Sequence, residues 1–253
     1  MSISENITAD NIFIALKYFA NQYRKEFGNQ SCEITIVGGA SVLLNYGFRD
    51  STQDVDYFGT PPQELNDIVL KVADKLKIDQ HWLNDDFKFS PSYSPKLREV
   101  STYFCSYNNG NLEIRTVKGE PLAAMKMLSG REALSDIPDI IGIIRGEKKL
   151  GNEILFDKIC EQGDFLYGDK FVVSESLMKR VKDYCSMNID DLDLAYRESV
   201  NKAYIIKEEI IIKTDANKQL LNRDAVKELG IDIEKKWYHT PGSTGGSKDE
   251  SCI

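Results

Sequence analysis

Apolar residues recur along the chain at the two spacings that distinguish helices from strands. Helical spacing, with an apolar residue at every third or fourth position, occurs in five stretches of the first 150 residues: 9–27, 40–45, 63–77, 122–131 and 136–145. We expect Asp10 to cap the first of these helices and Pro121 to open the fourth.

The segments between these helices alternate apolar and polar residues and contain many β-branched side chains, which is typical of strands. Strands are predicted at 32–37, 53–58, 97–107 and 111–117, and a loop at 80–95. The last two strands should form a hairpin across Asn108-Asn109-Gly110, because Asn-Gly is a strong signal for a tight turn. The order of elements predicts an α+β fold in which helices flank a small mixed sheet.

Beyond residue 150 the pattern becomes mainly helical. Helices are expected at 152–163, 174–186, 190–212 and 218–229, although the run Ile210-Ile211-Ile212 also suits a strand. From Thr240 onward the chain has the composition of a linker and is expected to be disordered. We therefore predict a mixed-sheet core at 1–150, a helical domain at 151–239 and a disordered tail at 240–253.

Composition narrows the classes of function. The formal net charge of −8 argues against unselective coating of nucleic acid, which needs clustered Lys and Arg. Only His81 and His239 are present, without companions, which argues against a histidine-rich zinc site and against most Ser-His or Cys-His catalysis. If the protein is an enzyme, carboxylates are expected to carry the chemistry.

Several features predict a cytoplasmic protein. The five cysteines show no CxxC spacing, and an odd number cannot all pair within one chain, so we expect reduced thiols. The N-terminal residues lack a cationic segment followed by an apolar one, and no run of about 18 apolar residues predicts a membrane span.

Two glycines, Gly38 and Gly39, stand between the predicted strand at 32–37 and a short helix. Glycines let the backbone approach a ligand, and a helix start offers N–H groups to an anion, so the segment through Ser41 suits a triphosphate. A tight turn from strand to helix is the alternative interpretation of the glycine pair alone.

Asp54 and Asp56 lie two positions apart on the strand predicted at 53–58. Side chains two apart on a strand share a face, so the two carboxylates should lie side by side, with Val55 pointing into the core. Two adjacent acids repel each other unless a cation lies between them, which suits Mg²⁺ or Mn²⁺. The alternative is a pair of solvated acids at a strand edge.

A third set of polar residues follows. Glu113 lies on the last predicted strand and is a candidate third metal carboxylate, the alternative being an exposed strand acid. Lys126 lies on an otherwise apolar helix, and Arg131, Asp136 and Asp139 follow it. Lys126 and Arg131 suit either neutralisation of phosphates or pairing with Asp136 and Asp139 in a structural cluster of ion pairs.

Taken together, these motifs resemble the DNA polymerase β-like nucleotidyltransferases. The pattern is GG-x(9)-R-x(4)-D-x-D at residues 38–56, followed by a strand acid and then by AAMKMLSGR and SDIPDI at residues 123–140. Within that superfamily the chain is similar to the bacterial group that includes the abortive-infection (AbiEii-like) toxins. The resemblance covers residues 30–146 and implies that the mixed-sheet core is a nucleotidyltransferase core.

The resemblance also implies roles for individual residues. Asp54, Asp56 and Glu113 would be catalytic and hold the metal ions. Contacts with the nucleotide would come from a larger set: Gly38, Gly39, Ser41, Arg49, Thr52, Lys126, Arg131, Asp136 and Asp139. Ala40 departs from the family pattern, in which Ser or Thr often follows the two glycines directly. The third acid is also often Asp in the family.

The expected reaction moves a nucleoside monophosphate from a nucleoside triphosphate to a hydroxyl on tRNA, a protein or a small molecule such as an aminoglycoside. Seven basic residues are candidates for an RNA-binding face, although scattered charges of this kind are more often solvated: Lys96, Arg98, Lys118, Lys126, Arg145, Lys148 and Lys149. Residues 190–193 contain three acids that would attract a cationic small molecule or begin a helix.

Two functional hypotheses remain open on the sequence alone. The first is an enzyme, as the toxin of a toxin–antitoxin or phage-defence pair with a cognate antitoxin. The second is a catalytically inactive module with the same fold that acts as a binding or regulatory protein. The intact Gly38, Gly39, Asp54 and Asp56 favour the enzyme.

Overall fold

The computed structural model describes residues 6–59, 65–130 and 136–220. The chain divides into two compact units, Met1–Tyr204 and Ile205–Ile253, and the boundary falls within the last helix. The predicted tail at 240–253, nearly all of the predicted helix at 218–229, and Arg131 lie outside the described residues.

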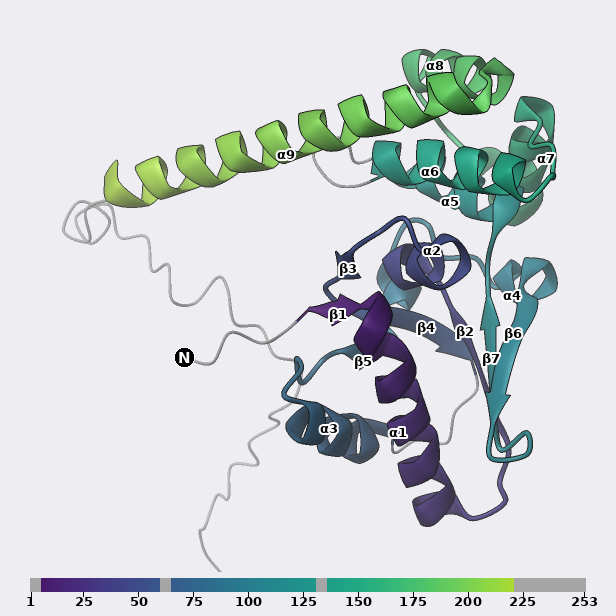
Figure 1. Ribbon diagram of the computed structural model, residues 1–253, viewed down its shortest axis with the longest axis vertical. Coiled ribbons are helices and arrows are strands. Elements are labelled where there is room, and N and C mark those ends of the chain that lie inside the picture. The colour runs from purple at the N-terminus through teal and green to yellow at the C-terminus, as the bar shows by residue number, and fades with distance from the viewer. Residues whose placement is uncertain (1–5, 60–64, 131–135, 221–253) are drawn as a thin grey trace, which may run out of the picture. The chain divides into compact units, whose positions relative to one another are not determined.

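The centre of the first unit is a five-stranded mixed sheet with the strand order β5-β4-β2-β7-β6 (Figure 1). β2 is antiparallel to β4 and parallel to β7, and β6 and β7 form an antiparallel hairpin. The strands span the following residues: β2 Cys32–Ile36, β4 Val55–Gly59, β5 Leu83–Asn84, β6 Thr102–Tyr107 and β7 Leu112–Thr116. The predicted fold class is confirmed.

One face of the sheet is covered by two helices, α1 Ala9–Phe27 and α3 Leu65–Leu76. Alternate strand residues, including Ile34, Ile36 and Val55, pack against the apolar faces of these helices in one core cluster. The other set of alternate residues, which contains Asp56, therefore points to the opposite face of the sheet. The prediction that Val55 faces the core is confirmed.

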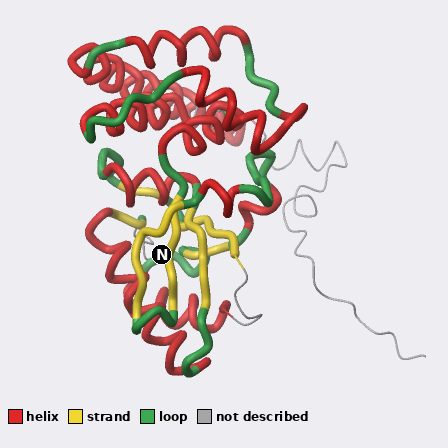
Figure 2. Tube along the Cα trace, turned by 90° about the vertical axis from the view of Figure 1, so that its right-hand side faces the viewer, coloured by secondary structure: helices red, strands yellow, loops and turns green. Residues whose placement is uncertain are grey.

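A second core cluster lies beyond the C-terminal ends of β2 and β7, where helices gather (Figures 1 and 2). It joins Val37 and Val117, which directly follow those two strands, to the helices α5 to α8 and to Leu192. α2 Gly38–Tyr46 contributes to both clusters. The later helices span the following residues: α5 Gly119–Ser129, α6 Asp136–Lys149, α7 Phe156–Tyr167, α8 Glu175–Ser186 and α9 Ile189–Leu220. The run at 210–212 is helical, not a strand.

Short elements depart from the predictions. The hairpin across Asn108-Asn109-Gly110 is confirmed, but residues 97–100 form one helical turn, α4 Leu97–Val100, instead of the start of a strand. β1 Ile7–Thr8 and β3 Ser51–Thr52 pair in a separate two-stranded sheet that no pattern indicated. Two 3₁₀ helices are also present in the part of the chain that the structure describes: η1 Asp86–Phe89 and η2 Gly168–Lys170.

Thr8 caps α1, and the prediction of Asp10 is wrong. The Thr8 hydroxyl accepts from the Asn11 N–H, and the Asn11 side chain accepts from the Thr8 N–H, which satisfies two N–H groups of the first turn reciprocally. Asp10 lies one position inside the helix, where its charge favours the helix dipole. None of the described helices combines the length and the apolarity needed to cross a membrane.

Candidate active site

The glycine pair forms the junction between β2 and α2. Gly38 has φ +65°, a left-handed conformation that side chains other than glycine rarely adopt. The Val37 N–H donates to the Asp56 carbonyl oxygen at 3.0 Å, which ties the junction to β4. A Cβ atom at position 38 would lie 3.1 Å from Asp56 Oδ2, so the carboxylate lies directly against the turn.

Gly39 is enclosed by two polar side chains. A Cβ atom at this position would overlap Arg49 Nη1 and would lie 2.7 Å from Thr52 Oγ1. Val37, the residue before the helix, makes no side-chain capping bond within the described residues, so the first turn of α2 offers N–H groups beside this side chain pair. The fold thus brings together five residues that the sequence singled out: Gly38, Gly39, Arg49, Thr52 and Asp56.

Asp54 lies just before β4 and carries its carboxylate toward the edge strand β5. Asn84 Nδ2 donates to Asp54 Oδ2 at 3.2 Å, and the parallel register places Asn84 beside Asp56. Asp54 and Asp56 are both partly buried. Sequence analysis missed Asn84, because a strand of two residues carries no periodic signal.

Two carboxylates fit a magnesium ion that is also bound by substrate phosphates, since Mg²⁺ commonly takes one or two protein carboxylates and completes its shell with phosphate oxygens and water. No group of three or more His, Cys, Asp or Glu side chains suited to a metal ion occurs in the described part of the chain. Asp54 and Asp56 alone would therefore share a cation with further oxygen ligands.

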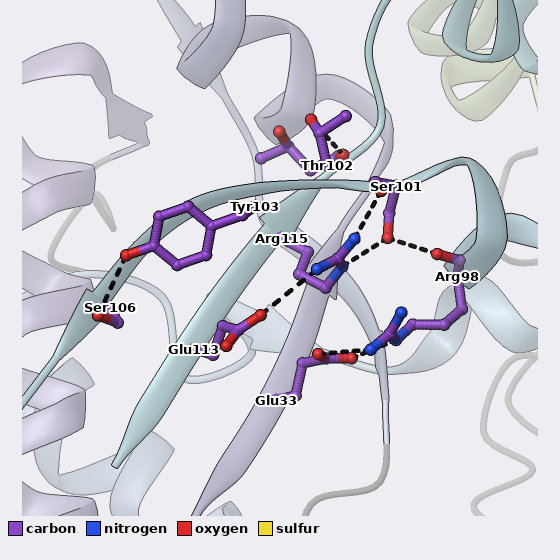
Figure 3. Close-up of polar contacts among 9 residues, drawn as sticks. Glu33, Arg98, Ser101, Thr102, Tyr103, Ser106, Glu113 and Arg115 are labelled. Carbon is purple, nitrogen blue, oxygen red and sulfur yellow. Dashed lines mark hydrogen bonds and ion pairs between the residues drawn. The ribbon is translucent and has the colours of Figure 1, made fainter. Parts of the chain in front are cut away.

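Glu113 lies on the same face of the sheet as Asp56 but elsewhere on it. The register pairs Glu113 with Glu33. Asp56 lies at the other end of this ladder, level with Val37 and Val117, which directly follow β2 and β7. Glu113 is thus four positions along β7 from that level, roughly 13 Å at the usual strand rise. Its carboxylate lies 3.4 Å from Arg115 Nη1 (Figure 3).

The region around Glu113 is a patch of paired charges. Arg115 also donates to the Ser101 hydroxyl and carbonyl oxygen at 2.8 and 2.7 Å, and Arg98 pairs with Glu33 (Figure 3). The structure therefore separates Glu113 from the pair Asp54 and Asp56 and gives it an ion-pair partner of its own.

A buried charge network adjoins the glycine turn. Lys126 Nζ lies 2.7 Å from Asp139 Oδ2 and 3.1 Å from Asp136 Oδ1, and these three residues are at most 5% exposed. Asp139 Oδ2 also lies 3.5 Å from Arg49 Nη1. The network therefore runs from the helices α5 and α6 to the Arg49 guanidinium beside Gly39. Arg49 is partly exposed, whereas the other members of the network are buried.

Ser41 takes a different place from the one expected. Its side chain is fully buried, and the hydroxyl donates to the Val117 carbonyl oxygen at 2.5 Å. Asn45 Nδ2 also donates to the Val117 carbonyl oxygen at 3.3 Å, so two side chains of α2 contact the residue that follows β7. The hydroxyl is thus used inside the fold.

Tyr196, on α9, supports the segment that carries Arg49. Its hydroxyl donates to the Phe48 carbonyl oxygen at 3.0 Å, and the two rings meet edge to face at 5.4 Å. Burial raises the pKa of the Tyr196 phenol, and the Arg145 guanidinium, which lies over its ring, opposes that rise. Sequence analysis missed this residue, since a tyrosine 147 positions after Arg49 gives no local signal.

Most of the predicted RNA-binding face is occupied by internal contacts. Six of the seven basic residues contact a carboxylate or a carbonyl oxygen: Lys96, Arg98, Lys126, Arg145, Lys148 and Lys149. The acids at 190–193 lie at the start of α9, where Asp191 and Asn188 exchange hydrogen bonds at 2.8 and 2.9 Å. The helix-start interpretation explains this acidic stretch.

A model of the family described as nucleotidyltransferase of unknown function (DUF6036) matches residues 14–162, which is more than half of the chain. The matched segment contains the glycine turn, both aspartates, Asn84 and the buried charge network. No curated protein and no solved structure matches the chain significantly.

Proposed function

Because the chain belongs to this family of nucleotidyltransferases, we propose that it transfers a nucleoside monophosphate from a nucleoside triphosphate to an acceptor hydroxyl. The acceptor oxygen forms a bond to the α-phosphorus, and the bond to the bridging oxygen breaks to release pyrophosphate. The acceptor hydroxyl gives up its proton to solvent water in the same step. The catalytic centre in this proposal is the junction of the glycine turn with Asp54 and Asp56.

One observation carries the proposal. The Asp56 carboxylate lies against Gly38, while Arg49 and Thr52 enclose Gly39 at the start of α2. A helix start with two glycines binds phosphate through its N–H groups, and a carboxylate beside it attracts the cation that accompanies a triphosphate. Both requirements of a nucleotide site are met within a few residues of the same turn.

We propose Mg²⁺ or Mn²⁺ as the cofactor, held by Asp54 and Asp56. Such an ion, when bound, makes the acceptor hydroxyl more acidic and stabilises the charge on the leaving pyrophosphate. The protein's own task is to hold the carboxylates and both substrates in the reacting geometry. Glu113 is left out of the proposed metal ligands, because the register separates it from the two aspartates.

Arg49 is the proposed phosphate contact, since its guanidinium borders Gly39 and stays partly exposed. Lys126, Asp136 and Asp139 act through it: the two buried acids hold Lys126, and Asp139 orients Arg49. A guanidinium fixed by a buried carboxylate is already ordered before the nucleotide binds, which lowers the entropic cost of binding.

The acceptor defines the biological role. The resemblance to abortive-infection toxins leads us to propose that the transfer arrests growth when a cognate antitoxin is absent. Expression of the wild type should then stop cell growth, whereas expression of the double variant Asp54→Asn/Asp56→Asn should not. If the wild type does not affect growth, the toxin role is contradicted, but the proposed nucleotidyl transfer is not.

The proposed chemistry is tested by incubating the protein with each α-labelled nucleoside triphosphate, Mg²⁺ or Mn²⁺ and a cell lysate. Label should appear in RNA, protein or a small molecule with the wild type, and the double variant should lose at least a hundredfold in rate while melting at the same temperature, since charge stabilisation of this kind is worth about 10²–10³.

A matched control removes two negative charges elsewhere. Asp67 and Asp74 are exposed on α3, and Asp67→Asn/Asp74→Asn should transfer label at the wild-type rate. If the wild type binds no nucleoside triphosphate with either metal ion, the proposed function is contradicted.

A further inference from the structure

Asn84 is the side chain that contacts the proposed metal ligand Asp54. It ends β5, where the register sets it beside Asp56. Its Nδ2 atom donates to Asp54 Oδ2 at 3.2 Å. A carboxylate offers about four lone-pair sites, so one amide bond leaves capacity for a cation.

The orientation of the Asn84 amide is defined by its other contacts. Nδ2 also donates to the His81 carbonyl oxygen at 3.2 Å, and Oδ1 accepts from the Asp86 N–H at 3.0 Å. A flipped amide would turn its oxygen toward two acceptors and its NH₂ group toward a donor. The surrounding backbone therefore presents an N–H group, and not an oxygen, to Asp54.

The strand that carries Asn84 is anchored in the core. Trp82 is fully buried, its indole N–H donates to the Val69 carbonyl oxygen at 3.2 Å, and its carbonyl oxygen accepts from the Val55 N–H at 2.6 Å. Its ring meets Phe19 edge to face at 6.2 Å. Asn84 is thus held by a short strand whose position is set by a large buried side chain.

Asp54 lies before the first residue of β4, and the sheet ladder begins only at Val55. Strand pairing therefore does not fix the position of Asp54, whereas the Asn84 amide contacts its carboxylate. Asn84 is also neutral. A Lys or Arg in its place would orient the carboxylate but would also cancel the charge that attracts a cation.

We propose that Asn84 is a positioning residue that orients Asp54 for cation binding without neutralising it. This inference rests on the proposed function, because it assigns Asn84 a part in the same metal site. Residues that orient a ligating carboxylate typically change metal affinity by about 10–100-fold when they are removed.

The inference is tested by binding of Mn²⁺ to the full chain, followed by electron paramagnetic resonance of free Mn²⁺, with and without a nucleoside triphosphate. Asn84→Ala should need at least tenfold more Mn²⁺ than the wild type for half-saturation, and a large excess of Mn²⁺ should restore nucleotide binding. Asn84→Ser should behave alike, because its hydroxyl is too short to reach Asp54, and it serves if the alanine variant does not fold.

The matched control is His81→Ala. Asn84 hydrogen-bonds to the backbone carbonyl oxygen of His81, so this variant keeps that bond and should bind Mn²⁺ like the wild type. Equal half-saturation in Asn84→Ala, Asn84→Ser and the wild type would overturn the role of Asn84 and leave the proposed function standing. A wild type that binds neither Mn²⁺ nor nucleotide would instead contradict the proposed function itself.

Discussion

The adjacent glycines Gly38 and Gly39 are required for different physical reasons. Gly38 has a left-handed backbone, and any side chain there would press on the Asp56 carboxylate. Gly39 is required because the guanidinium of Arg49 and the hydroxyl of Thr52 fill the space that a methyl group would need. The first glycine sets the path of the chain, and the second leaves room for the side chains that we propose to contact phosphate.

Gly39→Ala should therefore displace Arg49 and weaken binding of a nucleoside triphosphate at least tenfold, with little change in melting temperature. Isothermal titration with Mg²⁺ present measures the affinity. The control is Gly47→Ala. Gly47 has φ +62°, and a Cβ atom at this position would meet open space. Strain should cost it about 1 kcal/mol of stability, yet it should bind nucleotide normally. Equal affinities of Gly39→Ala and the wild type would contradict the placement of Arg49.

At the candidate site, the sequence pattern predicted which face of a strand a side chain occupies better than it predicted where along the sheet the side chain lies. Strand periodicity correctly set Val55 toward the core and assigned Glu113 to the open face. Periodicity predicts on which face of a strand a side chain lies but not how neighbouring strands are aligned. The distance between Glu113 and Asp56 therefore could not be predicted from it. Ser41 was selected for its position after the glycines, and only packing shows that its hydroxyl faces Val117.

Among the elements, α2 is hydrogen-bonded through Tyr46 to the helices beyond the sheet. The Tyr46 hydroxyl donates to Glu147 Oε1 at 2.6 Å and accepts from the Gly119 N–H at 2.7 Å. Asn152 Nδ2 donates to Glu147 Oε2 at 2.6 Å, so both oxygens of this buried carboxylate are satisfied. Burial and the bond to Glu147 raise the pKa of Tyr46, which keeps the phenol protonated as the donor.

Tyr46→Phe should lower the free energy of unfolding by roughly 1–3 kcal/mol, because it leaves a buried carboxylate oxygen and the Gly119 N–H without this partner. Urea denaturation followed by circular dichroism measures the change. Tyr103→Phe is the control: Tyr103 is 58% exposed, and its hydroxyl bonds only to Ser106 in the described residues. A loss below 0.5 kcal/mol, like that expected for the control, would show that the contact between α2 and α6 is dispensable.

Long elements were predictable and short ones were not. α1, α3 and α6 each repeat an apolar stripe over three or more turns, which is enough for a periodic signal. β1, β3 and β5 contain two residues each, and they exist because partners distant in sequence supply their hydrogen bonds. The site depends on two of these short strands, since Thr52 lies on β3 and Asn84 on β5.

In the first unit as a whole, the helix beyond the matched family region supports a segment that lies inside it. The family match ends at residue 162, but Tyr196 of α9 holds the backbone of Phe48, next to Arg49. Arg145 lies over the Tyr196 ring and pairs with Asp193, so α9 is fixed to α6 at the same point. Sequence patterning predicted the helix but could not show that it supports Arg49.

Acidic groups that are buried in the neutral form occur throughout this unit. Burial raises the pKa of Cys32 and Cys185 from 9.0 to about 11, and that of Tyr23, Tyr57 and Tyr107 from 10.0 to about 12. The four cysteines in the described residues form no disulfide. Each such group keeps its proton in the folded state at a pH where the unfolded chain has lost it.

The sign of the resulting pH dependence follows from this difference in bound protons. Between pH 9 and 11 the folded state binds more protons than the unfolded chain, so stability falls as the pH rises. The contribution is fully present below about pH 9 and is lost as the pH passes through the folded pKa values near 11. We expect the melting temperature to be level from pH 7 to 8.5 and to fall by several degrees by pH 10.5.

Differential scanning fluorimetry across this range measures the effect, with Cys32→Ala as the matched variant. Removing the thiol should lower the melting temperature at pH 7, because a small cavity replaces a buried side chain. Its melting temperature should nevertheless fall less steeply above pH 9, since one of the groups that resist ionisation is gone. A melting temperature that stays level to pH 10.5 in the wild type would contradict the burial of these groups, and parallel curves for both proteins would remove Cys32 from among the causes.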